Sequence, residues 1–227
     1  MQYQDLLKAC QAEWQAYTEH EFVTLLAAGN LPPQSFLQYL KQDFLFLKQY
    51  ARAYALAIYK SNSLADMRQA LPTLTALLDC EISHHVRFCQ NWGLTETEME
   101  QTKEDVGTVA YTRYVLDTGM SGNLLDLYTA LAPCSIGYAV IGQNIGNDPE
   151  TKWENNPFSS WIELYAGDEY QGHAMQGAEY FNTLLEKIDL NSERGQQLVA
   201  IFRTATRMEI AFWQQALKPV NKEIDYA

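Results

Sequence analysis

Hydrophobic residues recur every three to four positions through most of this chain, which is the spacing of one face of an α-helix. Strand-type alternation bounded by turn residues is missing from the sequence. We therefore expect one all-α domain over residues 1–227, a helical bundle of about seven to nine helices. The predicted helices span residues 6–28, 33–60, 63–92, 95–100, 106–117, 123–146, 159–166, 168–188 and 191–217.

Residues that cap or break helices set several of these boundaries. Ser63 and Asn191 are expected to cap the third and the last helix, because their side chains accept hydrogen bonds from free backbone N–H groups. Pro72 predicts a kink or a break inside the third helix. Gly119, Ser121 and Gly122 are expected to close the helix that precedes them. The polar tail, residues 218–227, is expected to dock loosely on the bundle.

The amino-acid composition argues against some classes of binding partner and of cellular location. Lys and Arg number 16 and Asp and Glu number 28, so the net charge is −12, which argues against nucleic acids and anionic membranes as partners. No apolar run approaches the roughly 20 residues that span a bilayer, and Met1–Asp5 lacks the basic start of a signal peptide. The cysteines at positions 10, 80, 89 and 134 form no Cys-x-x-Cys pair, so we expect free thiols in a cytoplasmic protein.

Two carboxylates fall on apolar helix faces. Asp43 lies in the stripe of the second predicted helix, and Glu209 lies on the apolar face of the last. A buried, unpaired carboxylate is costly, so each needs a partner or a ligand. Structural roles are the alternative: Asp43 pairs with an arginine or a tyrosine hydroxyl, and Glu209 sits at the edge of its face or pairs with Arg203 or Arg207.

A thiol interrupts the most apolar segment of the chain, residues 124–145. Cys134 follows Pro133, which is expected to bend the helix there, and Tyr138 lies one turn later on the same face. The sequence also holds 14 tyrosines, and a subset of them could line a flat slot for a planar heterocycle. This pattern predicts a thiol with a polar neighbour inside a cavity.

A metal site is a weaker alternative. Glu81 and His84 have the Glu-x-x-His spacing of di-iron bundles, but such a site needs a second Glu-x-x-His, which the chain lacks. We therefore expect His84 and His85 to be ordinary polar residues on a helix. The sequence shows no Gly-rich phosphate loop, no Gly-x-Ser-x-Gly and no zinc-type cysteine cluster.

Three segments in this order, Tyr39–Leu47, Ala132–Tyr138 and Met208–Trp213, resemble the TenA (thiaminase II) family, and Glu81–His84 and Trp161–Tyr165 also fit. The resemblance covers essentially the whole chain and implies the haem-oxygenase-like fold. It further implies hydrolysis of aminopyrimidines, notably 4-amino-5-aminomethyl-2-methylpyrimidine to the 5-hydroxymethyl compound in thiamin salvage, with slower cleavage of thiamin. A homotetramer without metal or other cofactor is implied as well.

The resemblance also assigns roles to individual residues. It implies that Cys134 is the nucleophile, Glu209 the acid/base and Asp43 the carboxylate that binds the pyrimidine. It implies further pocket residues, which are Tyr138, Tyr111, Tyr165 and Phe46. Phe46 stands where the family often has tyrosine, so one hydroxyl near the thiol is lost. Because the thiolate is the reactive form, we expect the site to lower the pKa of Cys134.

Other functions stay open at this point. A pyrimidine-binding or regulatory protein that has lost the chemistry is the main alternative, and Phe46 is the residue that favours it. A metal-dependent oxygenase on the same fold would draw only on Glu81 and His84. A plain oligomerisation module would leave Asp43, Cys134 and Glu209 unexplained on three apolar faces.

Overall fold

The fold comes from a computed structural model that describes residues 1–217, except for the side chain of Cys80, so the predicted docking of the tail lies outside the described residues. The described part contains α-helices and one π-helical turn, η1, and no strand. The elements are α1 (Tyr3–Ala9), α2 (Gln11–Thr18), α3 (Glu21–Ala27), α4 (Pro33–Lys60), α5 (Leu64–Ala76), η1 (Leu77–Glu81), α6 (Ile82–Asn91), α7 (Glu96–Gln101), α8 (Val106–Ser121), α9 (Leu124–Asn147), α10 (Ser159–Ala166), α11 (Asp168–Leu185) and α12 (Glu193–Leu217).

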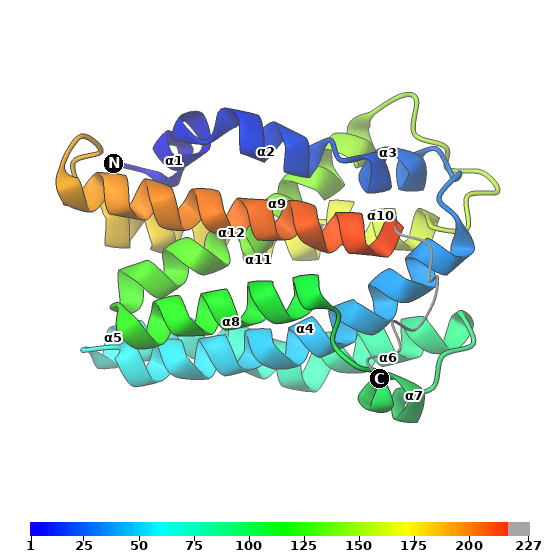
Figure 1. The fold of residues 1–227 in the computed structure, drawn as a ribbon, viewed down its shortest axis with the longest axis horizontal. Coiled ribbons are helices and arrows are strands. Elements are labelled where there is room, and N and C mark those ends of the chain that lie inside the picture. The colour runs from blue at the N-terminus through cyan, green and yellow to red at the C-terminus, as the bar shows by residue number, and fades with distance from the viewer. Residues whose placement is uncertain (218–227) are drawn as a thin grey trace, which may run out of the picture.

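Helix α9 forms the centre of the bundle and packs against α8, α10, α11 and α12. In Figure 1, α12 runs along the bundle below α1–α3, and α8 and α4 run beneath it. By length and composition α9 is apolar enough to cross a membrane, contrary to our expectation from the sequence. However, 72% of its most apolar 18-residue window is buried within the protein, which is the position of a core helix.

The first predicted helix is divided into α1, α2 and α3. The backbone leaves helical geometry at Cys10 (φ −120°, ψ 28°) and at Glu19 (φ −110°, ψ 23°). The His20 ring then accepts a hydrogen bond from Phe22 N and starts α3. The sequence concealed these breaks because the apolar periodicity continues across them. Together with the division of the third predicted helix, they give twelve α-helices in the described residues rather than seven to nine.

The third predicted helix begins as expected, with Ser63 Oγ accepting from Asp66 N at 3.0 Å. The chain remains helical through Pro72, so the break predicted there does not occur. Instead, η1 follows a turn later and joins α5 to α6. A π-helical turn adds a residue to the helix and often lies at a functional site. Here it ends on Glu81, which lines the cavities described below.

Two further boundaries differ from prediction. Helix α8 ends at Ser121 with the expected Gly122 as its C-cap, but it passes the predicted end at residue 117 and includes Gly119. A β-carbon at Gly119 would lie 2.8 Å from Leu127 Cδ1 and 2.9 Å from Leu56 Cδ2. The glycine thus allows α4, α8 and α9 to approach closely. The cap of α12 is Ser192 rather than Asn191, since Ser192 Oγ accepts from Gly195 N at 3.0 Å.

Candidate active site

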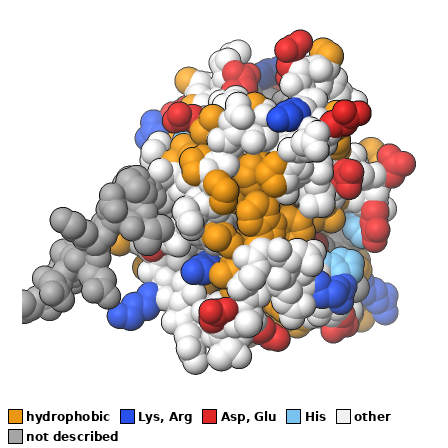
Figure 2. Space-filling view, turned by 90° about the vertical axis from the view of Figure 1, so that its right-hand side faces the viewer, with side chains coloured by type: hydrophobic (Ala, Val, Ile, Leu, Met, Phe, Trp, Pro, Cys, Tyr) orange, Lys and Arg blue, Asp and Glu red, His pale blue; other side chains and the backbone are white. Residues whose placement is uncertain are grey.

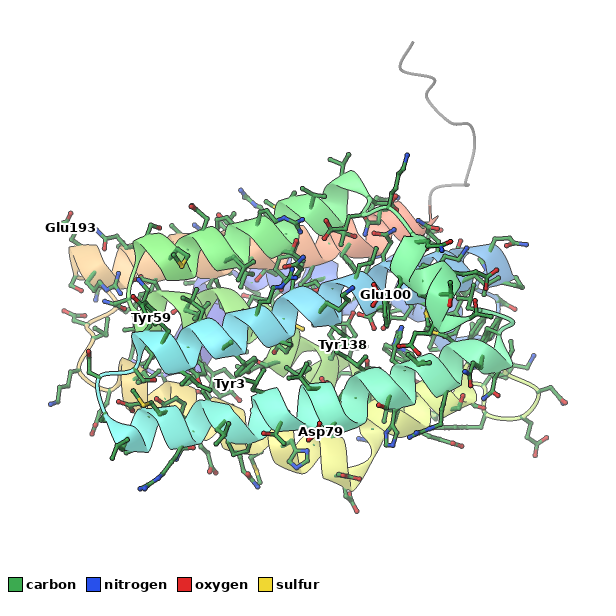
Figure 3. All side chains as sticks on the ribbon, turned by 90° about the horizontal axis from the view of Figure 1, so that it is seen from below. Tyr3, Tyr59, Asp79, Glu100, Tyr138 and Glu193 are labelled. Atoms are coloured by element: carbon green, nitrogen blue, oxygen red, sulfur yellow. The ribbon has the colours of Figure 1, made fainter. Side chains whose placement is uncertain are left out.

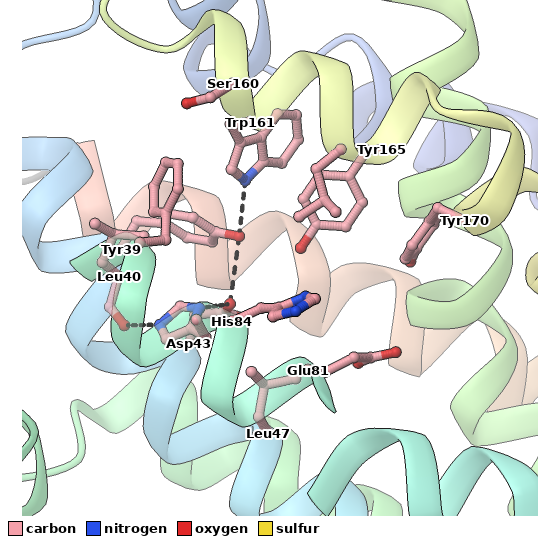
Figure 4. Close-up of a pocket in the computed structure, with 13 residues that line it drawn as sticks. Tyr39, Leu40, Asp43, Leu47, Glu81, His84, Ser160, Trp161, Tyr165 and Tyr170 are labelled. Atoms are coloured by element: carbon pink, nitrogen blue, oxygen red, sulfur yellow. Dashed lines mark hydrogen bonds and ion pairs between the residues drawn. The ribbon is translucent and has the colours of Figure 1, made fainter. Parts of the chain in front are cut away.

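Two adjoining cavities lie between α4, α6, α9, α10, α11 and η1. The thiol cavity, of about 120 Å³, contains Cys134. The indole cavity, of about 250 Å³, contains Trp161 and appears in Figure 4. Their common wall consists of Asp43, Leu47, Glu81, Tyr165 and Tyr170. Figure 3 shows Tyr138 near the middle of the bundle, so the site lies in its interior rather than at either end.

Cys134 is on α9, which stays helical through Pro133. Burial raises the pKa of the Cys134 thiol well above its ordinary value, and the nearby carboxyl groups of Glu209 and Asp43 raise it further. A hydrogen bond from Tyr50 acts in the opposite direction but is outweighed. Our expectation of a lowered pKa is therefore wrong for the free site, which holds a neutral thiol.

Glu209 on α12 is 1% exposed, so it lies inside the core and not at the edge of the helix face. Tyr111 donates its hydroxyl hydrogen to Glu209 Oε1 at 2.8 Å. Burial raises the pKa of Glu209 to about 8, despite the opposing effect of the Tyr111 hydrogen bond. The alternative ion pairs are absent, because Arg203 and Arg207 both contact Glu13 instead. Glu209 therefore carries a proton at neutral pH and has the protonation state of a general acid.

Asp43 on α4 is 5% exposed, and its Oδ2 atom has two polar neighbours. The Tyr39 hydroxyl lies at 3.5 Å and His85 Nδ1 at 3.4 Å. Burial raises the pKa of Asp43 to about 7, and the Tyr39 hydrogen bond lowers it. The tyrosine partner considered from the sequence is present, whereas the second partner is a histidine rather than an arginine.

Aromatic rings form the walls. The ring of Tyr165 lies 5.1 Å from that of Tyr138, 4.4 Å from that of Trp161 and 4.8 Å from that of Tyr170, measured between centroids. Such faces suit a flat heterocycle, which gains stacking contacts from aromatic side chains.

Phe46 also lines the thiol cavity, with its ring stacked on Tyr50 at 5.6 Å. Tyr111 lies behind it, 5.1 Å from the Phe46 ring, and is absent from the lining of the thiol cavity. The structure therefore brings Asp43, Cys134, Tyr138, Tyr165 and Phe46 around one space. It places Tyr111 one layer back, where it acts on Glu209.

Sequence reasoning missed His85, which we expected to be an ordinary polar residue. Its side chain is 11% exposed and contacts Asp43, whereas neighbouring His84 is exposed. Nothing in the local sequence distinguishes the two histidines. Tyr50 was also missed as a thiol partner, although its place on the apolar stripe of α4 could have indicated it. Among the described residues, no group of three or more His, Cys, Asp and Glu side chains is arranged to hold a metal ion.

Comparison with known proteins identifies the family of this chain. The sequence model of the TENA/THI-4/PQQC family matches residues 7–218. The chain belongs to this family. It is 42% identical over 214 residues to an uncharacterized protein of Haemophilus influenzae, covering 94% of this chain and 98% of that protein.

Two further proteins to which this TENA/THI-4/PQQC family member is similar have a named activity or a solved structure. It is 34% identical over 217 residues to the aminopyrimidine aminohydrolase of Halalkalibacterium halodurans, with 93% of each chain covered. A crystal structure of a TenA family transcription regulator from Silicibacter sp. superposes with a TM-score of 0.90 at 38% identity, with 96% of each chain covered. These findings confirm the resemblance to TenA proteins and the all-α fold expected from it.

Proposed function

We propose that this TenA-family chain hydrolyses aminopyrimidines, converting 4-amino-5-aminomethyl-2-methylpyrimidine into the 5-hydroxymethyl compound. The observation that carries the proposal is a thiol and a buried aspartic acid on one aromatic-walled cavity, with a protonated glutamic acid outside the cavity lining but near enough to raise the pKa of that thiol. The 34% identity to an aminopyrimidine aminohydrolase over 93% of both chains supports it.

The site fits recognition of a flat, polar ring. Tyr138 and Tyr165 supply stacking surfaces, and Asp43 lies on the wall shared by both cavities. Its carboxyl group accepts a hydrogen bond from the 4-amino group of the pyrimidine. The indole cavity continues beyond this wall, and we assign it to larger leaving groups on the 5-methylene arm, such as the thiazolium of thiamin.

Because the free thiol is neutral, the first step is the addition of S–H across a ring bond. Glu209 donates its proton to a ring nitrogen, and the sulfur of Cys134 forms a bond to the adjacent ring carbon. The thiol proton passes to Glu209, so the carboxyl group ends the step protonated again. A raised thiol pKa is compatible with this route, since no free thiolate has to accumulate.

The second half of the reaction removes the leaving group. The amine is bound in its ammonium form, and the electron pair of the 4-amino nitrogen moves into the ring and expels neutral ammonia from the 5-methylene carbon. This leaves an exocyclic C=C bond on a cationic ring. Water adds its oxygen to that carbon and gives up one proton to the released ammonia, so that the ring recovers its electrons. The C–S bond then breaks, and the proton on the ring nitrogen returns through Glu209 to sulfur. The aromatic walls limit access of bulk water to the intermediate.

Product formation from the aminomethyl pyrimidine, run beside thiamin, tests this function. We expect release of ammonia and of the hydroxymethyl pyrimidine, with a slower reaction on thiamin. Asp43→Ala is expected to weaken pyrimidine binding in calorimetry. Tight binding of the pyrimidine without turnover of either compound would instead establish a binding or regulatory protein and overturn the proposal.

A homotetramer is also proposed, on the strength of exposed apolar side chains. Leu71, Leu78, Leu164 and Met175 are 51%, 54%, 51% and 61% exposed in the single chain. Figure 2 shows hydrophobic side chains gathered at one end of the bundle, with acidic and basic side chains around them. Exposed apolar groups of this size often mark protein interfaces. Light scattering on the purified protein tests the assembly, and the cytoplasmic location stays a prediction.

A further inference from the structure

His85 occupies a position from which it acts on the pyrimidine site through Asp43. Its Nε2 atom lies 2.8 Å from the carbonyl oxygen of Leu40, and its Nδ1 atom lies 3.4 Å from Asp43 Oδ2. The imidazole is thus held between a backbone acceptor on α4 and the carboxyl group that faces the cavities. It lines the indole cavity, while Asp43 separates it from the thiol cavity.

The Leu40 carbonyl and the Trp161 indole N–H determine the directions of the hydrogen bonds around His85, Asp43 and Tyr39. The Leu40 carbonyl can only accept, so Nε2 carries a hydrogen, and Nδ1 of a neutral imidazole presents a lone pair to Asp43. Trp161 Nε1 donates to the Tyr39 oxygen at 3.1 Å, which leaves the Tyr39 hydroxyl hydrogen free to face Asp43 Oδ2. Two lone pairs facing each other would repel, so one proton belongs between Oδ2 and Nδ1.

In the free site this proton rests on Asp43. Burial raises the pKa of Asp43 to about 7, and burial lowers the pKa of His85, so both shifts favour a neutral acid beside a neutral imidazole. Asp43 also interacts electrostatically with other titratable groups on the helices around it. These groups are Tyr39, Glu81, Cys89, Cys134, Tyr138, Tyr165, Tyr170 and Glu209. The carboxyl groups of this set, Glu81 and Glu209, also have raised pKa values.

We propose that His85 is a positioning residue that takes the proton of Asp43 when the bound ring becomes cationic. The O–H bond of Asp43 breaks, an N–H bond forms at His85 Nδ1, and the proton returns when the ring becomes neutral again. Asp43 thereby meets the free ring as an uncharged acceptor and meets the cationic ring as a carboxylate. This inference rests on the proposed function, in which the ring is cationic once the electron pair of the 4-amino nitrogen has expelled the leaving group.

The advantage of this arrangement is that the negative charge appears only when positive charge develops. A permanent carboxylate inside the aromatic core would raise the pKa of Cys134 further and would bear the full cost of burial. A charge that forms together with the cationic ring stabilises the transition state more than the bound substrate, which raises kcat.

His85→Gln tests the proposal, because a glutamine amide can donate to the Leu40 carbonyl but has no second ring nitrogen to take the proton. We expect kcat for the aminomethyl pyrimidine to fall by about tenfold or more, with KM changed far less. The matched control is Arg87→Gln, an exposed change on the same helix, for which we expect the rates of the parent. A kcat in His85→Gln equal to that of the control would overturn the proposal, and so would a parallel loss of kcat, affinity and thermal stability, which indicates a purely structural role.

A second measurement needs no change at His85. Nitrogen-15 NMR of histidine-labelled Cys134→Ser protein follows Nδ1 while the hydroxymethyl pyrimidine is bound, and His85→Gln in that background identifies the signal. We expect Nδ1 to change from a lone-pair nitrogen to an N–H nitrogen as the bound ring is protonated on lowering the pH. An Nδ1 signal that does not follow ring protonation contradicts the relay. Failure of the parent protein to turn over substrate would instead count against the proposed function.

Discussion

Replacing Glu209 with glutamine is expected to abolish the chemistry and, at the same time, to stabilise the fold at alkaline pH. Burial raises the pKa of Glu209 to about 8 from an ordinary 4.5, so the native state holds this proton more tightly than the unfolded chain does. The free energy of unfolding is therefore greatest, for this group, below pH 4.5 and falls as the pH rises towards 8.

The size of this effect follows from the two pKa values. One pKa unit corresponds to about 1.4 kcal/mol, so between pH 5 and pH 8 the parent loses about 3 kcal/mol of stability from Glu209 alone. Glutamine has the same shape and can still accept the Tyr111 hydrogen bond, but it does not ionise. The variant is expected to lose less stability than the parent over this range, by about 3 kcal/mol.

Urea denaturation of both proteins at pH 5 and pH 8, at one protein concentration, measures this difference. Ammonia release measured on the same samples should fall in the variant at both pH values, since the proton donor is gone. Parallel pH dependence of stability in parent and variant would show that Glu209 is ionised normally in the fold. That result would refute both the stability argument and the assignment of Glu209 as an acid protonated at neutral pH.

Three further predictions follow from the same groups. Tyr111→Phe removes a hydrogen bond that lowers the pKa of Glu209, so the alkaline limb of the pH profile of kcat/KM should move to higher pH; a limb that does not move would contradict this. Cys134 should react with iodoacetamide more slowly than a free thiol of ordinary pKa at pH 7.5, as read by peptide mass spectrometry, whereas fast alkylation would indicate a thiolate. Asp43→Asn should lose less of its free energy of unfolding than the parent does between pH 5 and pH 8, and an equal loss in both proteins would show that Asp43 is not held protonated by burial.

The helical architecture could be predicted because it depends on periodicity and local caps. The bounds of α4 and α10 and the capping by Ser63 follow directly from the chain. The breaks at Cys10 and Glu19 could not be predicted, since the apolar periodicity continues across them. Gly119 was also misjudged, because a glycine that allows close contact between helices looks the same in the sequence as a glycine that ends a helix.

The site was predictable in its residues but not in its electrostatics. Asp43, Cys134 and Glu209 stand out because each is a polar group on an apolar face. Their protonation depends on burial and on each other, so the raised pKa of Cys134 reverses what the chemistry of an isolated thiolate suggests. His85 could not be recognised, because its role comes from the Leu40 carbonyl and from Asp43, both on a different helix.

The most direct test of the central claim is the rate of hydroxymethyl pyrimidine formation by the parent protein and by Cys134→Ser, with pyrimidine binding measured for both. We predict turnover by the parent, nearly complete loss in the variant and similar binding by the two proteins, because a serine hydroxyl is a far weaker nucleophile at neutral pH. Equal rates in the two proteins would contradict covalent catalysis by Cys134.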